Sequence, residues 1–88
     1  MSKMMSKTIK CVLFKNDTVL ITQIEEVEAE LGDPNCKLIN PYQFFTEEDL
    51  KPWPEITNQS EIMVNSDSIL TIVDPKPEVV RKYLELIA

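Results

Sequence analysis

The sequence predicts a single, mostly β domain that ends in one α-helix. Short runs of β-branched and aromatic residues recur along the chain and are separated by turn-forming residues, a pattern typical of strands. In residues 76–88, apolar side chains recur at helical spacing behind the helix-start signal Asp74-Pro75-Lys76-Pro77. A length of 88 residues leaves room for one hydrophobic core only.

Two strands are expected in the first part of the chain. The run 8–14 is closed by turn-forming residues, and a second strand is predicted over 18–31. The apolar parity of this long strand changes at Glu25-Glu26, so we expect a β-bulge or a sharp bend there. An amphipathic helix over 23–31 is the alternative, because its apolar residues also satisfy helical spacing.

The middle of the chain is divided by its turn and proline residues. Gly32, the only glycine, opens Gly-Asp-Pro-Asn and predicts a reversal at Asp33-Pro34. A third strand is expected over 36–45, where Pro41 requires either an edge position or a bend. The acidic stretch 46–60, interrupted by two prolines, is predicted to be a long surface loop.

That predicted loop carries Trp53 between Pro52 and Pro54. Long loops in compact domains are often functional, and a rigid aromatic residue can anchor a protein partner. Trp53 is therefore a candidate protein-interaction residue. The alternative is that its ring folds over the sheet as a lid on the core.

The segment 61–74 contains two β-rich apolar runs around the polar tetrad Asn65-Ser66-Asp67-Ser68. Asn, Ser and Asp side chains bond to nearby backbone groups and tolerate turn conformations, whereas the flanking residues favour a pleated surface. The pattern predicts a β-hairpin.

Composition excludes several functional classes. The net charge of −6 disfavours broad electrostatic binding of nucleic acid. Without histidine, and with one glycine, the chain lacks the residues of most common catalytic designs and of phosphate-binding loops, so we expect neither an enzyme nor a bound cofactor. Cys11 and Cys36 are expected to be structural thiols, and the glutamates of 25–30 a solvated face rather than a metal site.

No apolar stretch approaches the length needed to span a bilayer, and the N-terminus lacks the apolar core of a signal peptide. We therefore expect no membrane association and a cytoplasmic location. Residues 1–7 are taken as a flexible N-terminus outside the fold.

The order of these elements resembles the Sm and Sm-like (LSm) family. The family's first motif is matched by Lys15-Asn-Asp-Thr-Val-Leu-Ile-Thr through Asn35-Cys-Lys-Leu38, with Asn35 and Leu38 at the expected mutual spacing. Its second motif aligns with Asn65-Ser66-Asp67-Ser68-Ile69. Here Asn65 and Ser66 stand where the family usually has Arg-Gly.

The resemblance implies a small five-stranded, strongly bent antiparallel Sm-like barrel over residues 8–75, followed by the helix of 76–88. It further implies a homo-oligomeric ring in which the fourth and fifth strands of neighbours pair. The family's RNA site lies in the loop after the reversal and in the closing hairpin. The corresponding candidate RNA-binding residues are Asp33, Asn35, Lys37, Asn65, Ser66 and Asp67.

Two functions follow as alternatives. In the first, an Sm-like ring binds single-stranded RNA, with Asn35 and Asn65 contacting bases and Lys37 touching phosphate. In the second, the ring has lost its RNA site and serves as a structural or protein-interaction ring, recruiting a protein partner through Trp53, the acidic loop or the terminal helix. The acidic residues around Asn65 favour the second alternative, whereas the RNA binding that is typical of the family favours the first.

Overall fold

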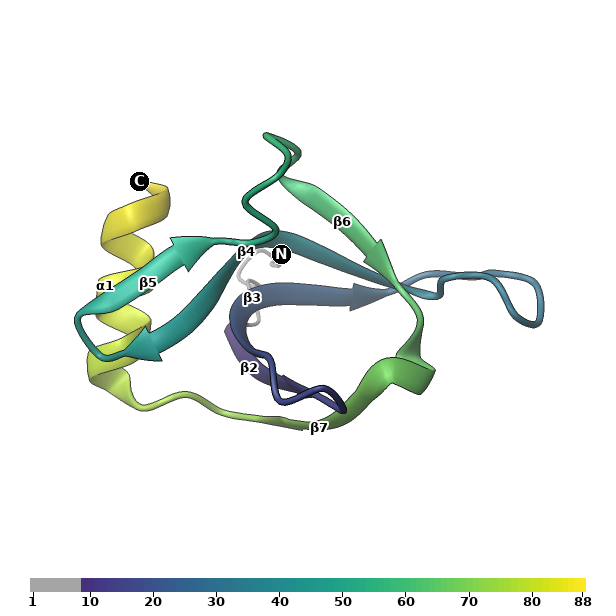
Figure 1. Ribbon diagram of the computed structural model, residues 1–88, viewed down its shortest axis with the longest axis horizontal. Coiled ribbons are helices and arrows are strands. Elements are labelled where there is room, and N and C mark those ends of the chain that lie inside the picture. The colour runs from purple at the N-terminus through teal and green to yellow at the C-terminus, as the bar shows by residue number, and fades with distance from the viewer. Residues whose placement is uncertain (1–8) are drawn as a thin grey trace, which may run out of the picture.

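The computed structural model describes residues 9–88 and shows an antiparallel sheet of six strands with one C-terminal helix (Figure 1). The predicted flexible segment 1–7 lies outside the described residues. The elements are β2 (Ile9–Phe14), β3 (Val19–Glu26), β4 (Cys36–Thr46), β5 (Asp49–Pro52), β6 (Glu61–Val64), the 3₁₀ turn η1 (Ser66–Ser68), β7 (Ile69–Val73) and α1 (Pro77–Ile87).

The mostly β fold with a C-terminal helix is confirmed, but the number of strands differs from the prediction. The stretch 46–60 is not wholly a loop, because β5 folds back on β4 as a short hairpin. Leu50 supplies the reason: its side chain is buried in the core, which fixes the strand in spite of the charged residues beside it. The rest of that stretch, between β5 and β6, is irregular.

The sheet is open. Its strands follow the order β5-β4-β3-β2-β7, and β6 pairs with the part of β4 that β5 does not reach. The predicted hairpin over 61–74 is therefore wrong, since β6 pairs with β4 and β7 pairs with β2 (Figure 1). The tetrad between them forms η1, which carries the chain from one edge of the sheet to the other.

The second strand is shorter than predicted, and its alternative, a helix over 23–31, does not form. β3 ends at Glu26, and residues 27–35 make an arm that projects beyond the sheet (Figure 1). The backbone N–H of Asp33 donates to the carbonyl oxygen of Glu30 at 2.9 Å, so the reversal falls just before the predicted Asp33-Pro34. Gly32 has φ +92°, a conformation that L side chains rarely adopt, and this explains why the only glycine lies here.

The bend predicted as one alternative for Pro41 is observed, whereas the β-bulge or bend expected at Glu25-Glu26 is not. The register between β3 and β4 shifts by one residue, so that Asn40 and Pro41 together face Thr22. Such an arrangement is a β-bulge, and Asn40 adopts φ +53° within it. Pro41 also marks the point where β4 changes its outer partner from β6 to β5, so its missing N–H interrupts neither ladder.

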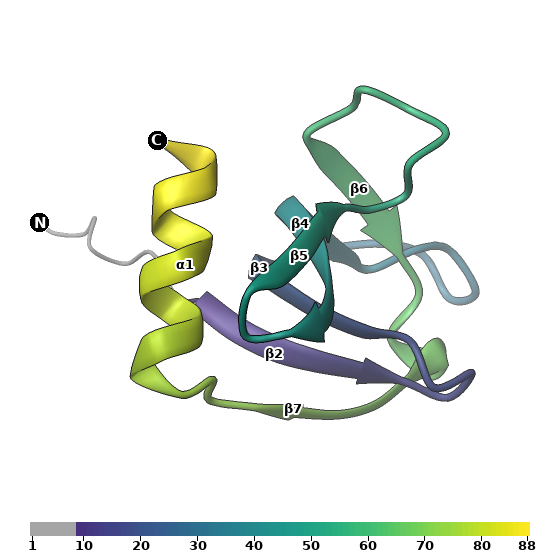
Figure 2. The same cartoon turned by 60° about the vertical axis from the view of Figure 1, so that its left-hand side comes forward.

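Alternation along the strands fills the two faces of the sheet. Leu20 points to one side and joins a cluster with Val12, Phe14 and Leu38, whereas the adjacent Ile21 points to the other. Ile21 packs there with Leu50 from β5 and with Val79 and Tyr83 from α1. The helix thus covers one end of the sheet (Figure 2).

Helix α1 is fixed to the bulge by its buried tyrosine. The Tyr83 hydroxyl donates to the carbonyl oxygens of Asn40 and Ile39, at 2.9 and 3.2 Å. The Ile39 carbonyl oxygen also accepts from the Thr22 hydroxyl at 3.0 Å, so the Tyr83 hydroxyl joins a cluster of side-chain hydrogen bonds at the bulge. Among residues 9–88, no helix is long and apolar enough to cross a membrane.

Candidate functional site

The structure brings together five of the six candidate RNA-binding residues. They line a shallow hollow of about 190 Å³ between the arm of residues 27–35 and η1: Asp33, Asn35, Asn65, Ser66 and Asp67. The two segments that the resemblance placed side by side are therefore neighbours in space. Lys37 does not line this hollow.

Asn35 uses its backbone and its side chain to hold the arm against η1. Its backbone N–H donates to the Val64 carbonyl oxygen at 3.2 Å, and its carbonyl oxygen accepts from the N–H of Val27 at 3.0 Å. The side-chain Oδ1 accepts from the backbone N–H of Ser66 at 2.9 Å, and Nδ2 donates to the Ser66 hydroxyl oxygen at 3.1 Å. Both ends of the amide are thus engaged within the protein.

Asn65 completes the same connection from the other side. Its Oδ1 accepts from the backbone N–H of Asp67 at 2.9 Å, which caps the first turn of η1. Its Nδ2 donates to the carbonyl oxygen of Gly32 at 3.4 Å. We call the two amides, with Ser66, the asparagine clasp. Asn side chains commonly accept from the backbone N–H two residues on, and this turn chemistry was the sequence signal for a structural role of Asn65.

Lys37 lies on β4, and its charge is compensated by carboxylates. Its Nζ is 3.1 Å from Oε1 of Glu25, directly opposite on β3, and 3.8 Å from Oε1 of Glu61 on β6. The hydrogen bond to Glu25 and the negative charges of both glutamates raise the pKa of the Lys37 ammonium. The lysine links three strands at the surface.

The charges at the hollow do not suit a phosphate. Glu30, Asp33 and Asp67 line it together with the clasp, and no lysine or arginine does so. Their negative charges repel a nucleic-acid backbone. With both asparagine amides engaged and Lys37 neutralised elsewhere, the hollow offers little of what RNA recognition requires.

Trp53 occupies the position expected of a lid. Its ring is half-buried and meets the Phe14 ring edge-on, with 5.7 Å between the centroids and an interplanar angle of 71°. Its backbone N–H donates to the carbonyl oxygen of Pro41 at 3.0 Å. The indole ring is thus part of the core packing that closes one face of the sheet.

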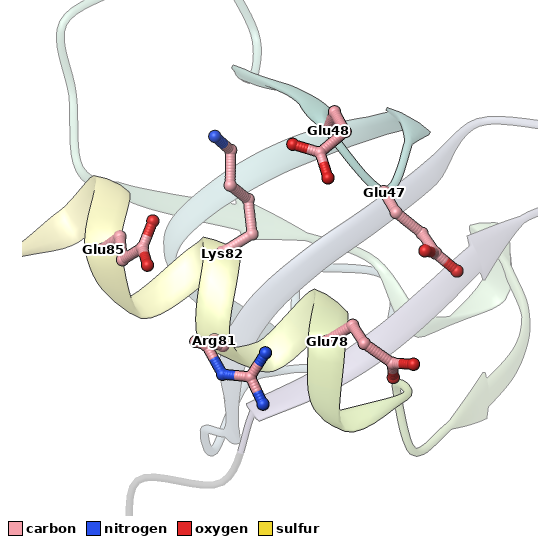
Figure 3. A pocket seen from close by; sticks show the side chains of 6 residues that line it. All are labelled: Glu47, Glu48, Glu78, Arg81, Lys82 and Glu85. Carbon is pink, nitrogen blue, oxygen red and sulfur yellow. The ribbon is translucent and has the colours of Figure 1, made fainter.

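A second hollow lies between α1 and the turn that joins β4 to β5 (Figure 3). Four glutamates and two basic residues surround it: Glu47, Glu48, Glu78, Arg81, Lys82 and Glu85. The side chains of Arg81 and Lys82 point in different directions (Figure 3). Because the carboxylates outnumber the cations and the cations diverge, the hollow is not an anion site.

The free sides of β6 and β7, two of the three edge strands of the open sheet, are the more distinctive surface. Among the described residues, β6 pairs only with β4 and β7 only with β2, so each leaves one row of backbone groups without a strand partner. Large apolar side chains are exposed on both strands: Met63 on β6, and Leu70, Ile72 and Val73 on β7. Leu70 is 65% exposed. The sequence pattern did not predict this surface, because it predicted that β6 and β7 pair with each other as a hairpin.

The remaining titratable groups offer no further site. Within residues 9–88, no three His, Cys, Asp or Glu side chains gather closely enough to hold a metal ion. Both cysteines are free thiols; Cys36 is buried and Cys11 half-buried. Burial raises the pKa of both thiols, which lowers their reactivity near neutral pH.

Comparison with known proteins gives a family but no activity. No curated protein matches the chain significantly. The chain matches, over residues 7–88, the model of a family described as a family of unknown function (DUF6561). The match covers nearly the whole sequence, and the chain therefore belongs to that family.

Proposed function

We propose that this protein is a self-assembling structural scaffold of Sm-like architecture, in which β6 of one copy pairs with β7 of the next. If β5 is set aside as an addition to β4, the remaining strands follow the order β7-β2-β3-β4-β6. The fourth and fifth of these five strands in the chain are then the two at the open edges. These are the strands through which Sm-like subunits pair.

The observation that carries the proposal is the pair of exposed apolar edges. An unpaired edge invites association, and monomeric proteins usually blunt it with charges, prolines or bulges. β7 carries neither a charge nor a proline: its sequence is Ile-Leu-Thr-Ile-Val, and every residue after Ile69 is exposed. Its one irregularity is a register shift against β2 that leaves Leu70 as an extra residue, and from Thr71 to Val73 the pairing is regular. Pairing would satisfy the backbone groups and bury apolar side chains that a small domain cannot cover by itself.

The contact joins two different surfaces, so it is head-to-tail. Such contacts close into a ring where the rotation between copies allows it. A scaffold without an RNA site agrees better with the hollow at the clasp than an RNA-binding ring does. The amides that would contact bases are bonded to Ser66, Asp67 and Gly32, and the nearby side chains are acidic.

The solution mass tests the proposal. Wild-type protein is expected to be oligomeric at micromolar concentration in sedimentation velocity and light scattering, whereas Leu70→Lys should weaken association roughly tenfold or more, because a charge replaces apolar area in the contact. Leu84→Lys is the matched control: Leu84 is a similarly apolar, exposed residue on α1, and this variant should assemble normally. A strictly monomeric wild type would refute the scaffold.

Binding of oligo-U and oligo-A RNA at low salt separates the two functions. We expect no binding beyond that of an unrelated acidic protein of similar size. Binding that weakens steeply with salt and is lost in Asn65→Ala would instead establish the RNA-binding ring.

A further inference from the structure

Two apolar features of the surface are open to solvent in the single copy. The first is Ile56, which is 94% exposed in the turn between Pro54 and Thr57, where the N–H of Thr57 donates to the carbonyl oxygen of Pro54 at 3.4 Å. Turn positions favour polar or small residues, so a branched aliphatic side chain is unexpected there. The second is an open apolar pocket at the far end of β7.

This pocket, of about 320 Å³, lies where β7 ends and α1 begins. Its apolar lining comes from four strands and the helix: Cys11, Val19, Ile21, Phe44, Val73 and Val79. Three charged residues also line it: Glu47, Asp74 and Lys76. Asp74 is paired with Lys10. The 3.7 Å contact between Lys76 Nζ and Glu47 Oε2 involves two exposed side chains, so that pair can rearrange at little cost. We call this the β7 pocket.

The proposed assembly would bring the two features together. β6 runs toward η1 and β7 runs away from it. In a ring, every copy places η1 at the same distance from the axis, so the η1 ends of β6 in one copy and of β7 in the next lie side by side. Because β6 ends at η1 and β7 begins there, the two paired strands run antiparallel. The start of β6, at Glu61, then lies beside the end of β7, at Val73, which lines the pocket.

Ile56 precedes Glu61 by five residues, a stretch of chain that spans at most about 18 Å. The turn that carries it is therefore within reach of the β7 pocket of the neighbouring copy. We infer that Ile56 of each copy fills the β7 pocket of the next copy. This inference rests on the proposed assembly and identifies the contact that fixes the register of the paired strands.

One residue beside each feature carries a charge opposite to the other: Glu55 beside Ile56, and Lys76 at the pocket. Glu55 precedes Ile56 in the turn and is exposed, and it forms no ion pair within residues 9–88. Lys76 at the mouth of the pocket is exposed and bound only through its long contact to Glu47. With Ile56 inserted, Glu55 meets Lys76 of the neighbour. Of the two carboxylates that also line the pocket, Asp74 is paired with Lys10 and Glu47 holds Lys76 only through an exposed contact, so Glu55 of a second copy competes with Glu47 alone.

Association of an Ile56→Ser variant tests the contact. Burial of an isoleucine side chain predicts that the dissociation constant rises roughly tenfold to a hundredfold in sedimentation equilibrium. Leu31→Ser is the matched control, because Leu31 is equally exposed at the tip of the 27–35 arm, away from the pocket. Its dissociation constant should equal that of the wild type.

Cross-linking tests the same contact directly. Ile56→Cys should form an intersubunit disulfide with the native Cys11 of the pocket under mild alkaline oxidation with oxidised glutathione, giving covalent dimers and longer products on a non-reducing gel. The products should vanish in Ile56→Cys/Cys11→Ser and should not form with Leu31→Cys. If the wild type oligomerises while Ile56→Ser associates normally and Ile56→Cys gives no Cys11-dependent product, this inference is refuted and the scaffold stands. If the wild type is monomeric, both are refuted.

Discussion

Replacement of Asn35 by alanine tests whether the asparagine clasp holds the fold together. The substitution removes two side-chain hydrogen bonds to Ser66, of 2.9 and 3.1 Å. Each such bond contributes about 0.5–1.5 kcal/mol net. Because Ser66 is exposed and water can replace part of what is lost, we expect the free energy of unfolding to fall by about 1–2 kcal/mol. In a domain of this size that lowers Tm by roughly 5–10 °C.

Urea and thermal unfolding, followed by circular dichroism, measure this loss. The measurement belongs in the Leu70→Lys background, because self-association would otherwise make Tm depend on protein concentration. Asn58→Ala is the control: Asn58 is an exposed asparagine in the loop before β6 whose side chain makes no hydrogen bond with residues 9–88, and its loss should change stability by less than about 0.5 kcal/mol. If Asn35→Ala unfolds like the control, the clasp does not stabilise the fold, and its amide is free for another role.

Three further results are expected. Tyr83→Phe should destabilise the fold by about 1 kcal/mol, since it deletes the hydroxyl that bonds the bulge carbonyls. Burial raises the pKa of Tyr83 above its unfolded value of about 10, so the wild type should lose stability as pH rises above that value, and Tyr83→Phe should lose less over the same alkaline titration. Gly32→Ala should cost about 1 kcal/mol in urea unfolding, because the strain comes from φ +92° and not from a clash. Added salt should strengthen self-association in sedimentation, because each copy carries a charge of −6; weaker association at higher salt would contradict the apolar edge contact.

Local patterns predicted the elements well where the signal was strong. The helix of 76–88 is observed as Pro77–Ile87, and the first strand is observed from Ile9 to Phe14. The β-rich runs on both sides of Asn65–Ser68 are strands as well. In each case, the apolar pattern lies within one strand or one helix, so residues close together in the sequence decide which of the two forms.

Other predictions failed because a distant partner decided the structure. β5 forms because Leu50 reaches a core built from β3 and α1, which outweighs the loop-like composition around it. β6 and β7 do not pair with each other, because β6 pairs with β4 and β7 pairs with β2. The bulge expected at Glu25-Glu26 does not form, because those residues pair regularly with Lys37 and Cys36; the bend predicted as one alternative for Pro41 is observed instead, where β4 changes its outer partner from β6 to β5.

The candidate site shows the same division. The sequence alone determined which residues would meet, since the hollow unites five of the six that the resemblance named, and it determined the acidic charge around them. Only the tertiary structure decided what their polar groups do. Asn35 and Ser66 are 31 residues apart, and their hydrogen bonds exist only because the sheet brings the arm against η1. Residue type and local pattern fix propensity and charge, whereas long-range pairing decides which amides are engaged and which edges remain open.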